Sequence, residues 1–224
     1  MLLLTIDTST PDLIVGLVNH SDSAFELVID HSRLNCRDHN EQLVPTIQDA
    51  LVQTSRTFGD VDGVVLGQGP GPFTGLRVGM ATGIAIADAR GIPVYPVCSS
   101  DAIANTARRK HGAGALQVAT DARRREVYSA TYDEAGNRIS DPEVIKPEEL
   151  ELRATTLAVP ENPPRLREIF LARNPELNFL PASPDPLGLA EAVADFDNTI
   201  LPVVPLYLRR PDATVPQNIK KAIP

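Results

Sequence analysis

The chain opens with three short β-rich runs: Leu2-Leu3-Leu4-Thr5-Ile6-Asp7, Leu13-Ile14-Val15-Gly16-Leu17-Val18 and Phe25-Glu26-Leu27-Val28-Ile29. Pro11 and Asp12 separate the first two runs, and the polar residues 19–23 separate the last two. Short apolar runs between turn-forming residues are typical of strands. These residues therefore predict a three-stranded meander at the start of an α/β fold.

The residues that follow alternate between helical and strand patterns. A helix is predicted over 40–58, where Asp38 and Glu41 are spaced as a capping box. Pro45 lacks an N–H, so this helix either is kinked there or begins later than the capping pattern suggests. The remaining predicted elements are a buried strand at 61–67, a helix at 74–89, a strand at 93–97 and a helix at 99–110.

The same order begins again after residue 112. Strands are predicted at 115–120, 126–132 and 138–145, then a helix at 147–152, a strand at 156–159, and helices at 165–173 and 187–196. This predicts two domains, 1–111 and 112–224. Most of the 20 prolines lie from Pro142 onward, which favours a reduced second lobe with surface loops. Disorder is expected over 211–224.

A repeated βββαβα unit is the ribonuclease H-like core of the actin-like superfamily, which includes sugar kinases and heat-shock ATPases. Proteins of that superfamily normally hold ATP between two such lobes. The predicted fold is therefore two ribonuclease H-like lobes, the second reduced. Such a fold does not by itself establish a function.

Composition restricts the possible functions. The 224 residues are 42% hydrophobic and carry a net charge of -8, with two cysteines far apart in sequence. A globular, cytoplasmic protein without disulfides or a membrane segment is expected. The negative charge repels nucleic acid, so RNA contact is expected only through a partner. The four histidines have no paired metal-ligand spacing, and no serine-hydrolase motif occurs.

Two turns could have descended from phosphate-binding loops. The first contains Asp7, Thr8 and Ser9, but Thr8 stands where the ATPases usually have glycine. The second is Gly67-Gln68-Gly69-Pro70-Gly71-Pro72-Phe73-Thr74-Gly75-Leu76-Arg77, in which two prolines remove N–H donors. We interpret Asp7, Thr8, Ser9, Gly69, Gly71 and Thr74 as a degenerate nucleotide or phosphate loop; a hairpin cap and a rigid turn are the alternatives.

Small residues recur every four positions at Gly75, Gly79, Gly83 and Ala87. They form a stripe on one helix face that another element can approach closely. The stripe either packs inside the lobe or forms a subunit interface, and the two are compatible. If it forms an interface, Gly79→Leu is expected to abolish a complex without unfolding the chain.

Five motif blocks together resemble the bacterial TsaB (YeaZ) family: Asp7-Thr8-Ser9-Thr10, His39-Asn40-Glu41-Gln42-Leu43, Gly69-Pro70-Gly71-Pro72-Phe73-Thr74-Gly75-Leu76-Arg77-Val78-Gly79, Asp121-Ala122-Arg123-Arg124-Arg125-Glu126-Val127-Tyr128 and Pro205-Leu206-Tyr207-Leu208-Arg209. They extend over nearly the whole chain. Pro72 is a departure, since the family commonly has serine there.

The resemblance implies a non-catalytic subunit that binds the paralogous enzyme TsaD and the ATPase TsaE during synthesis of threonylcarbamoyladenosine in tRNA. It also implies that the first two helices bind TsaD, through Gln42, Leu43, Ile47 and the stripe. His39 lacks the second histidine that binds metal in TsaD. Metal and ATP are expected only on the partners, so this chain alone is expected to bind no cofactor.

Three further possibilities follow from the sequence. The main alternative function is a stand-alone actin-like ATPase or small-molecule kinase. A glycoprotease is disfavoured by the missing metal pair. A homodimer of the isolated chain is plausible because paralogous helices are alike, and the arginines at 108–109 and 123–125 could contact tRNA held by a partner.

Overall fold

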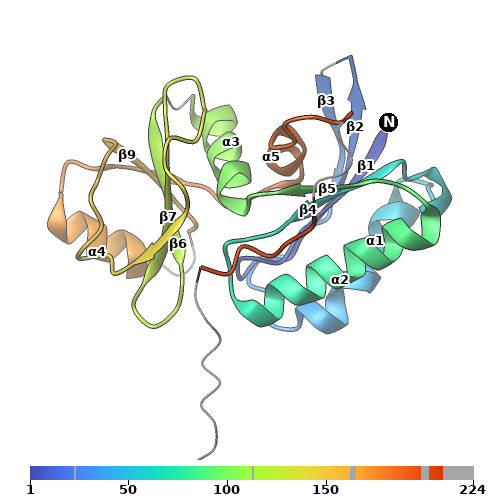
Figure 1. Cartoon of the computed structure of the whole chain (residues 1–224), viewed down its shortest axis with the longest axis horizontal. Coiled ribbons are helices and arrows are strands. Elements are labelled where there is room, and N and C mark those ends of the chain that lie inside the picture. Colours follow the sequence, from blue (N-terminus) through green and yellow to red (C-terminus); the bar gives the residue numbers. More distant parts are fainter. Residues whose placement is uncertain (23, 113, 162–164, 198–201, 209–224) are drawn as a thin grey trace, which may run out of the picture.

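The computed structural model describes residues 1–22, 24–112, 114–161, 165–197 and 202–208. Two five-stranded sheets lie side by side, each at the centre of one lobe (Figure 1). Their strand orders are β3-β2-β1-β4-β5 and β10-β9-β6-β7-β8. The predicted α/β fold with two ribonuclease H-like lobes is confirmed. The predicted tail, 211–224, lies outside the described residues.

The first sheet contains the predicted meander. β1 (Leu2–Asp7), β2 (Ile14–Ser21) and β3 (Ala24–Asp30) pair antiparallel, and β4 (Gly63–Gly67) and β5 (Val94–Val97) extend the sheet in parallel. All six residues of β1 are buried, because helices cover both faces of the sheet. A continuous apolar strand is typical of such a central position.

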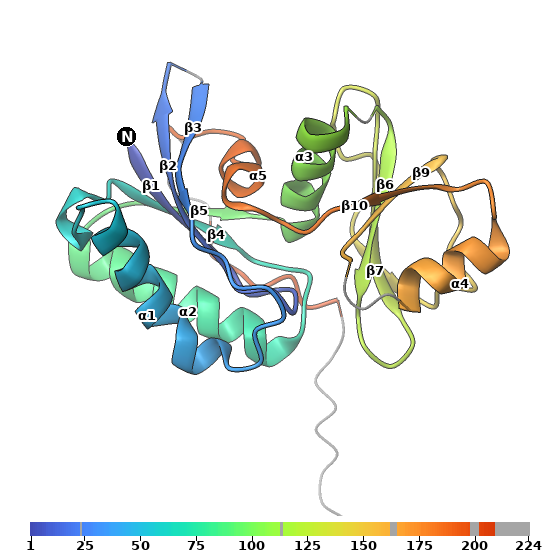
Figure 2. The same cartoon turned by 180° about the vertical axis from the view of Figure 1, so that it is seen from behind.

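Alternate residues of β1 point to opposite faces. Leu2, Leu4 and Ile6 pack with α1 (His39–Gln53) and α2 (Phe73–Arg90). Leu3 packs on the other side, in one cluster with Ala102 of α3 (Ser99–His111) and Leu189 of α5 (Pro186–Glu191). Figure 2 shows α1 and α2 together on one side of this sheet, with α3 and α5 on the other.

The second lobe is smaller, as predicted. It contains β6 (Leu116–Asp121), β7 (Val127–Tyr132), β8 (Glu143–Ile145), β9 (Thr156–Val159), β10 (Asn178–Pro181) and α4 (Arg165–Arg173). α4 packs on one face of the sheet through Leu166 and Phe170. α3 packs on the other face through Ile103 and Ala107. Because α3 also packs on the first sheet, it joins the two hydrophobic cores.

Several predicted boundaries are wrong. α1 ends at Gln53, a separate 3-10 turn follows at Phe58–Asp60, and Asp38 makes no side-chain capping bond. The helix begins at His39 and continues through Pro45, so a later start is excluded. Residues 147–152 form a turn rather than a helix, and β10 was not predicted.

The last predicted helix, over 187–196, belongs to the first lobe. Only Pro186–Glu191 is helical, and this short α5 packs against α3 and the first sheet. Asp185 caps it by accepting the Gly188 N–H at 2.8 Å and forms an ion pair with Arg109 at 2.6 Å. Residues 116–181 form the second sheet and its helix, and after β10 the chain returns to the first lobe.

Candidate functional site

Asp7 lies at the end of β1, where the superfamily has its acidic residue, and it is fully buried. Its Oδ1 accepts the Ser9 N–H at 2.6 Å. Its Oδ2 is buried without a hydrogen-bond partner. Burial raises the pKa of this carboxyl, although the hydrogen bond from the Ser9 N–H opposes the increase. A carboxylate in this environment cannot reach a ligand in solution.

The glycine-rich loop between β4 and α2 seals Asp7. A Cβ at Gly67 would overlap the carboxylate, and one at Gly71 would overlap the backbone of Ser9. Ser99 fixes the loop from α3, because its N–H donates to the Gly69 carbonyl at 2.8 Å and its Oγ accepts the Gly69 N–H at 3.2 Å. The loop thus needs glycine for close packing against β1.

This packing changes the interpretation of the predicted phosphate loop. Ser9, Gly69 and Gly71 are buried, and Thr74 is exposed but does not line the neighbouring cavity. Gly69 is in the left-handed region at φ 94° and its N–H is already bonded. Of the six predicted residues, Thr8 lines a cavity described here. The rigid-turn interpretation therefore describes the loop better than a phosphate cradle does.

The small-residue stripe packs inside the lobe. A Cβ added to Gly79 would overlap Thr8 Oγ1, and one added to Gly75 would lie 2.5 Å from the Thr8 carbonyl oxygen. Gly83 lies against Leu66, and Ala87 is buried. Gly79, Gly83 and Ala87 of this stripe are therefore buried within the lobe, as the internal-packing alternative expects. Gly79→Leu would disrupt the fold itself, contrary to the expectation from sequence.

The predicted partner-binding residues of α1 also face mostly inward. Leu43 and Ile47 are fully buried, while Gln42 is half-buried and accepts a hydrogen bond from Arg33 at 3.1 Å. Among these residues and the stripe, Ile47 lines a surface groove and Gly75 lines a cavity beside the start of α2. Partner binding by α1 and α2 thus stays a prediction, and most of the residues predicted for it face the interior of the lobe.

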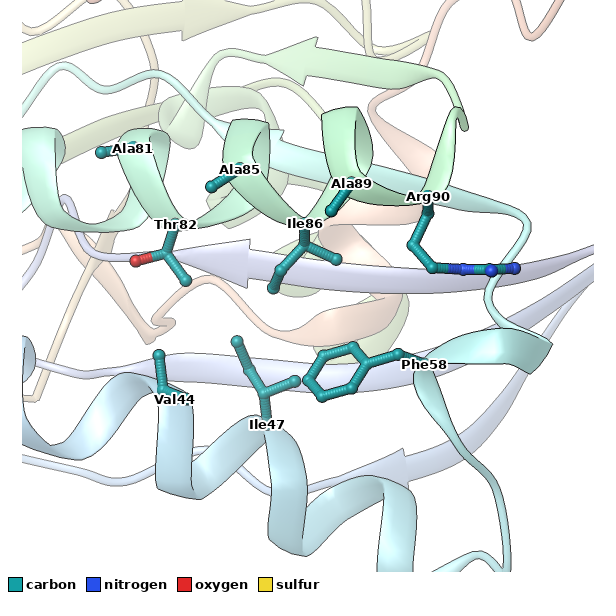
Figure 3. A pocket seen from close by; sticks show the side chains of 9 residues that line it. All are labelled: Val44, Ile47, Phe58, Ala81, Thr82, Ala85, Ile86, Ala89 and Arg90. Atoms are coloured by element: carbon teal, nitrogen blue, oxygen red, sulfur yellow. The ribbon is translucent and has the colours of Figure 1, made fainter.

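The outward sides of α1 and α2 form an apolar groove of about 630 Å³ (Figure 3). Val44 and Ile47 line it from α1 and Phe58 from the following turn, whereas α2 contributes Ala81, Thr82, Ala85, Ile86, Ala89 and Arg90. Val44 is 44% exposed. The spacing of Ala81, Ala85 and Ala89 could have indicated this face, but the glycines at neighbouring positions gave a stronger pattern.

His39, at the start of α1, lines a second cavity, at the boundary between the lobes. Its Nε2 is buried and has no hydrogen-bond partner. Burial lowers the pKa of the imidazole, and contacts with backbone carbonyls of Asp12 and Pro11 only partly oppose this. In the part of the chain that the structure describes, no group of three His, Cys, Asp or Glu side chains could hold a metal ion.

A partly buried polar cluster connects α3 to the second lobe. Asp101 accepts hydrogen bonds from Tyr132 at 2.7 Å and from Arg138 at 3.0 Å. Burial raises the pKa of Asp101, while these two partners lower it. The cluster links α3 to the second lobe, and Asp101 and Arg138 also line a small cavity of about 230 Å³. No helix among the described residues is long and apolar enough to cross a membrane.

The duplicated lobes and the acid at the end of β1 define a protein of the actin-like superfamily. The family model TsaD, described as tRNA N6-adenosine threonylcarbamoyltransferase, matches residues 32–180. A solved structure of a Pseudomonas aeruginosa protein similar to peptidase YEAZ has a TM-score of 0.75 at 25% identity, covering 93% of this chain and 99% of that one.

Sequence relatives place the chain more narrowly. An uncharacterized protein of Mycobacterium bovis is 43% identical over 94% of this chain and 92% of that protein. The Escherichia coli tRNA threonylcarbamoyladenosine biosynthesis protein TsaB is 35% identical over 66% of this chain and 64% of its own length. The chain belongs to the family described by the TsaD model and, within it, to the TsaB (YeaZ) group.

Proposed function

We propose that this chain is a non-catalytic subunit for the biosynthesis of threonylcarbamoyladenosine in tRNA, acting in the cytoplasm. The observation that carries the proposal is the burial of Asp7 beneath the glycine-rich loop. An acid that performs chemistry must contact its substrate or a metal bound to it. Here the carboxylate is covered by Gly67 and Ser9, so the position that serves catalysis elsewhere in the superfamily serves packing.

The groove between α1 and α2 supports a role in binding another protein. It is apolar and open along two helices, and Val44, Ala81 and Ala85 on its sides are exposed. Such a surface is suited to a partner that inserts apolar helix side chains. The partner we propose is a TsaD-like paralogue, because the family model matched by this chain bears that enzyme's name.

The proposed complex places the chemistry on other chains. The TsaD-like subunit would supply the metal and the transfer reaction, and a TsaE-like ATPase would use ATP. This chain would contact tRNA only within the complex, which agrees with its net charge of -8. Without its partner, the same groove would support a homodimer, since two copies can cover each other's apolar helices.

Ala85→Glu tests the docking surface. Residue 85 is exposed and lines the groove, so glutamate has room in the monomer but would be buried without a counter-charge in the complex. Burying such a charge costs several kcal/mol, and we expect the affinity for the TsaD-like protein from the same organism to fall about 100-fold or more. Size exclusion with light scattering and a titration would measure this.

Ala172→Glu is the matched control, because residue 172 is an exposed alanine on α4, in the other lobe. It should leave both folding and association unchanged. A wild-type chain that forms no complex with the TsaD-like protein would refute the proposed role. ATP hydrolysis by the isolated chain that depends on the Asp7 carboxylate would favour the stand-alone ATPase. Hydrolysis that is unchanged when this carboxylate is removed would not support an actin-like mechanism.

A further inference from the structure

The small cavity beside β5, at the edge of the first sheet, is separate from the surfaces described above. It has a volume of about 230 Å³ and shares no lining residue with the groove between α1 and α2 or with the cavity lined by His39. Sites for drug-sized ligands usually have volumes of about 300 to 1,000 Å³, so this cavity suits a smaller molecule. Its lining comes from Gln68, residues 95–98, Asp101, Arg138, residues 192–195 and Leu206.

The lining carries charges of both signs. Arg138 supplies a guanidinium group, and Asp101 and Asp195 supply carboxylates. The side chains of Arg138 and Asp101 are only 32% and 28% exposed, so water and salt screen their charges less than on an open surface. A simple anion would be attracted by the guanidinium but repelled by the carboxylates, and a simple cation would meet the reverse. The cavity therefore favours a molecule that carries both charges.

The ion pair between Arg138 and Asp101 leaves hydrogen-bonding capacity on both partners. Nη1 of Arg138 donates to both carboxylate oxygens at 3.0 Å, and no hydrogen bond between described residues uses its Nε or Nη2. Oδ1 of Asp101 also accepts the Tyr132 hydroxyl at 2.7 Å, whereas Oδ2 accepts only from Arg138 among the described residues. A guanidinium has further N–H donors and a carboxylate has further lone pairs. The pair can thus hold an anionic and a cationic group side by side.

Gln68 adds an uncommitted amide to a lining that is otherwise largely apolar. Its backbone is fixed, because its N–H donates to the Val97 carbonyl at 2.9 Å and its carbonyl accepts the Leu206 N–H at 2.8 Å. The residue is half-buried, and no hydrogen bond between described residues uses its side chain. Val97, Val193 and Leu206 supply apolar surface. A small apolar side chain on the ligand would be buried against them.

Cys98 also lines the cavity, but it is not a reactive group. Burial and the nearby carboxylate of Asp101 raise the pKa of its thiol to about 11. The thiol is therefore protonated at neutral pH, whereas the thiolate is the nucleophilic form of cysteine. The chemistry of the lining is that of reversible binding.

We propose that this cavity binds a small free α-amino acid as a zwitterion. The carboxylate of the ligand is held by Arg138, and its ammonium group is held by Asp101 and Asp195. An α-amino acid carries these two groups on one carbon, which suits an ion pair whose partners lie 3.0 Å apart. Because the lining joins α3, the second lobe and Leu206, a bound ligand stabilises their arrangement. The inference goes beyond the proposed function, which requires only the groove.

NMR titration of the purified full chain tests the site, with L-valine and L-threonine as nearly isosteric probes. We expect saturable shifts at Gln68, Asp101 and Arg138. Equal affinity would assign binding to the charged groups and the apolar contacts, and tighter binding of L-threonine would add a contact between its hydroxyl and Gln68; both support the site. N-acetyl-L-valine lacks the ammonium group and L-valinamide lacks the carboxylate, so each should bind at least about tenfold more weakly than L-valine.

Two variants and their matched controls complete the test. Ala194→Phe introduces a large side chain from an exposed position in the lining and should abolish binding, whereas Ala172→Phe, at an exposed position on α4, should not. Arg138→Gln should weaken binding at least about tenfold, and Arg165→Gln, also exposed on α4, should bind as wild type. Circular dichroism verifies folding, and Ala194→Phe decides the outcome if Arg138→Gln does not fold.

Three results would overturn the proposal. The first is the absence of saturable shifts with both amino acids at concentrations up to tens of millimolar. The second is wild-type affinity in the folded cavity variants. The third is binding of N-acetyl-L-valine or L-valinamide as tight as that of L-valine, which would exclude recognition of a zwitterion.

Discussion

The packing of α2 on Thr8 predicts that Gly79→Ala destabilises the protein, although alanine favours helices. In a helix interior, alanine is favoured over glycine by about 1 kcal/mol. At residue 79, however, the new Cβ would overlap Thr8 Oγ1 and lie 3.2 Å from Thr8 Cγ2 and 3.3 Å from Thr8 Cβ. Rotation of the hydroxyl alone cannot relieve contacts with three atoms.

Thr8 cannot move away easily. Its side chain is buried and β-branched, and Oγ1 donates to the Gly75 carbonyl at 2.8 Å. Overpacking at such a site costs about 1 to 3 kcal/mol. After subtraction of the helix preference, the free energy of unfolding should fall by roughly 0 to 2 kcal/mol in Gly79→Ala. If the helix preference of alanine acted alone, Gly79→Ala would instead raise the free energy of unfolding.

A double-mutant cycle separates these effects. Thr8→Ala removes Oγ1 and Cγ2 and leaves only Cβ near residue 79. In that background Gly79→Ala should therefore stabilise the helix, and the coupling energy between the two substitutions should be about 2 kcal/mol. Urea unfolding followed by circular dichroism measures each variant. Ala81→Gly, on the exposed side of α2, calibrates the helix preference. Stabilisation of the wild-type background by Gly79→Ala, or zero coupling with Thr8→Ala, would refute the packing argument.

Two further predictions concern buried carboxylates. Because burial raises the folded-state pKa of Asp7 above 3.8, its contribution to stability is present below pH 3.8 and is lost as pH rises through the folded-state pKa. Between acid and neutral pH, the free energy of unfolding measured with urea should therefore fall less in Asp7→Asn than in the wild type. Parallel pH profiles of the two proteins would contradict this. Asp185→Ala removes the α5 cap and the ion pair with Arg109 and should cost about 2 kcal/mol, measured by thermal unfolding, whereas Asp185→Asn should retain the cap and lose less.

Strand positions were predictable because their determinants are local. Leu2, Leu4 and Ile6 alternate with Leu3 and Thr5, and all five are buried, so β1 and its neighbours follow from apolar content and turn residues. α5 was placed in the wrong lobe because its position depends on contacts distant in sequence: Pro186 packs against Gly16, and Asp185 pairs with Arg109. No local pattern records such contacts.

The inward orientation of the predicted partner-binding residues was hidden for a related reason. A glycine stripe predicts close approach but does not identify the approaching group, which here is Thr8 of the same lobe rather than a second subunit. The groove residues Ala81 and Ala85 have a weak signal, since alanine is common on exposed and buried helix faces alike. Gln68, Asp101 and Arg138 lie far apart in sequence and meet only when the two lobes are placed together.

The sealed acid and the docking groove are connected through α2. Gly71 and Ser9 hold the loop over Asp7, and the same loop leads directly into α2, whose Gly75 and Gly79 rest on Thr8. The opposite side of this helix carries Ala81, Ala85 and Ala89 into the groove. A larger residue at 75 or 79 would therefore displace the groove wall together with the cover over Asp7. The close packing that removes Asp7 from solvent also fixes the position of α2, and with it the surface that we propose for partner binding.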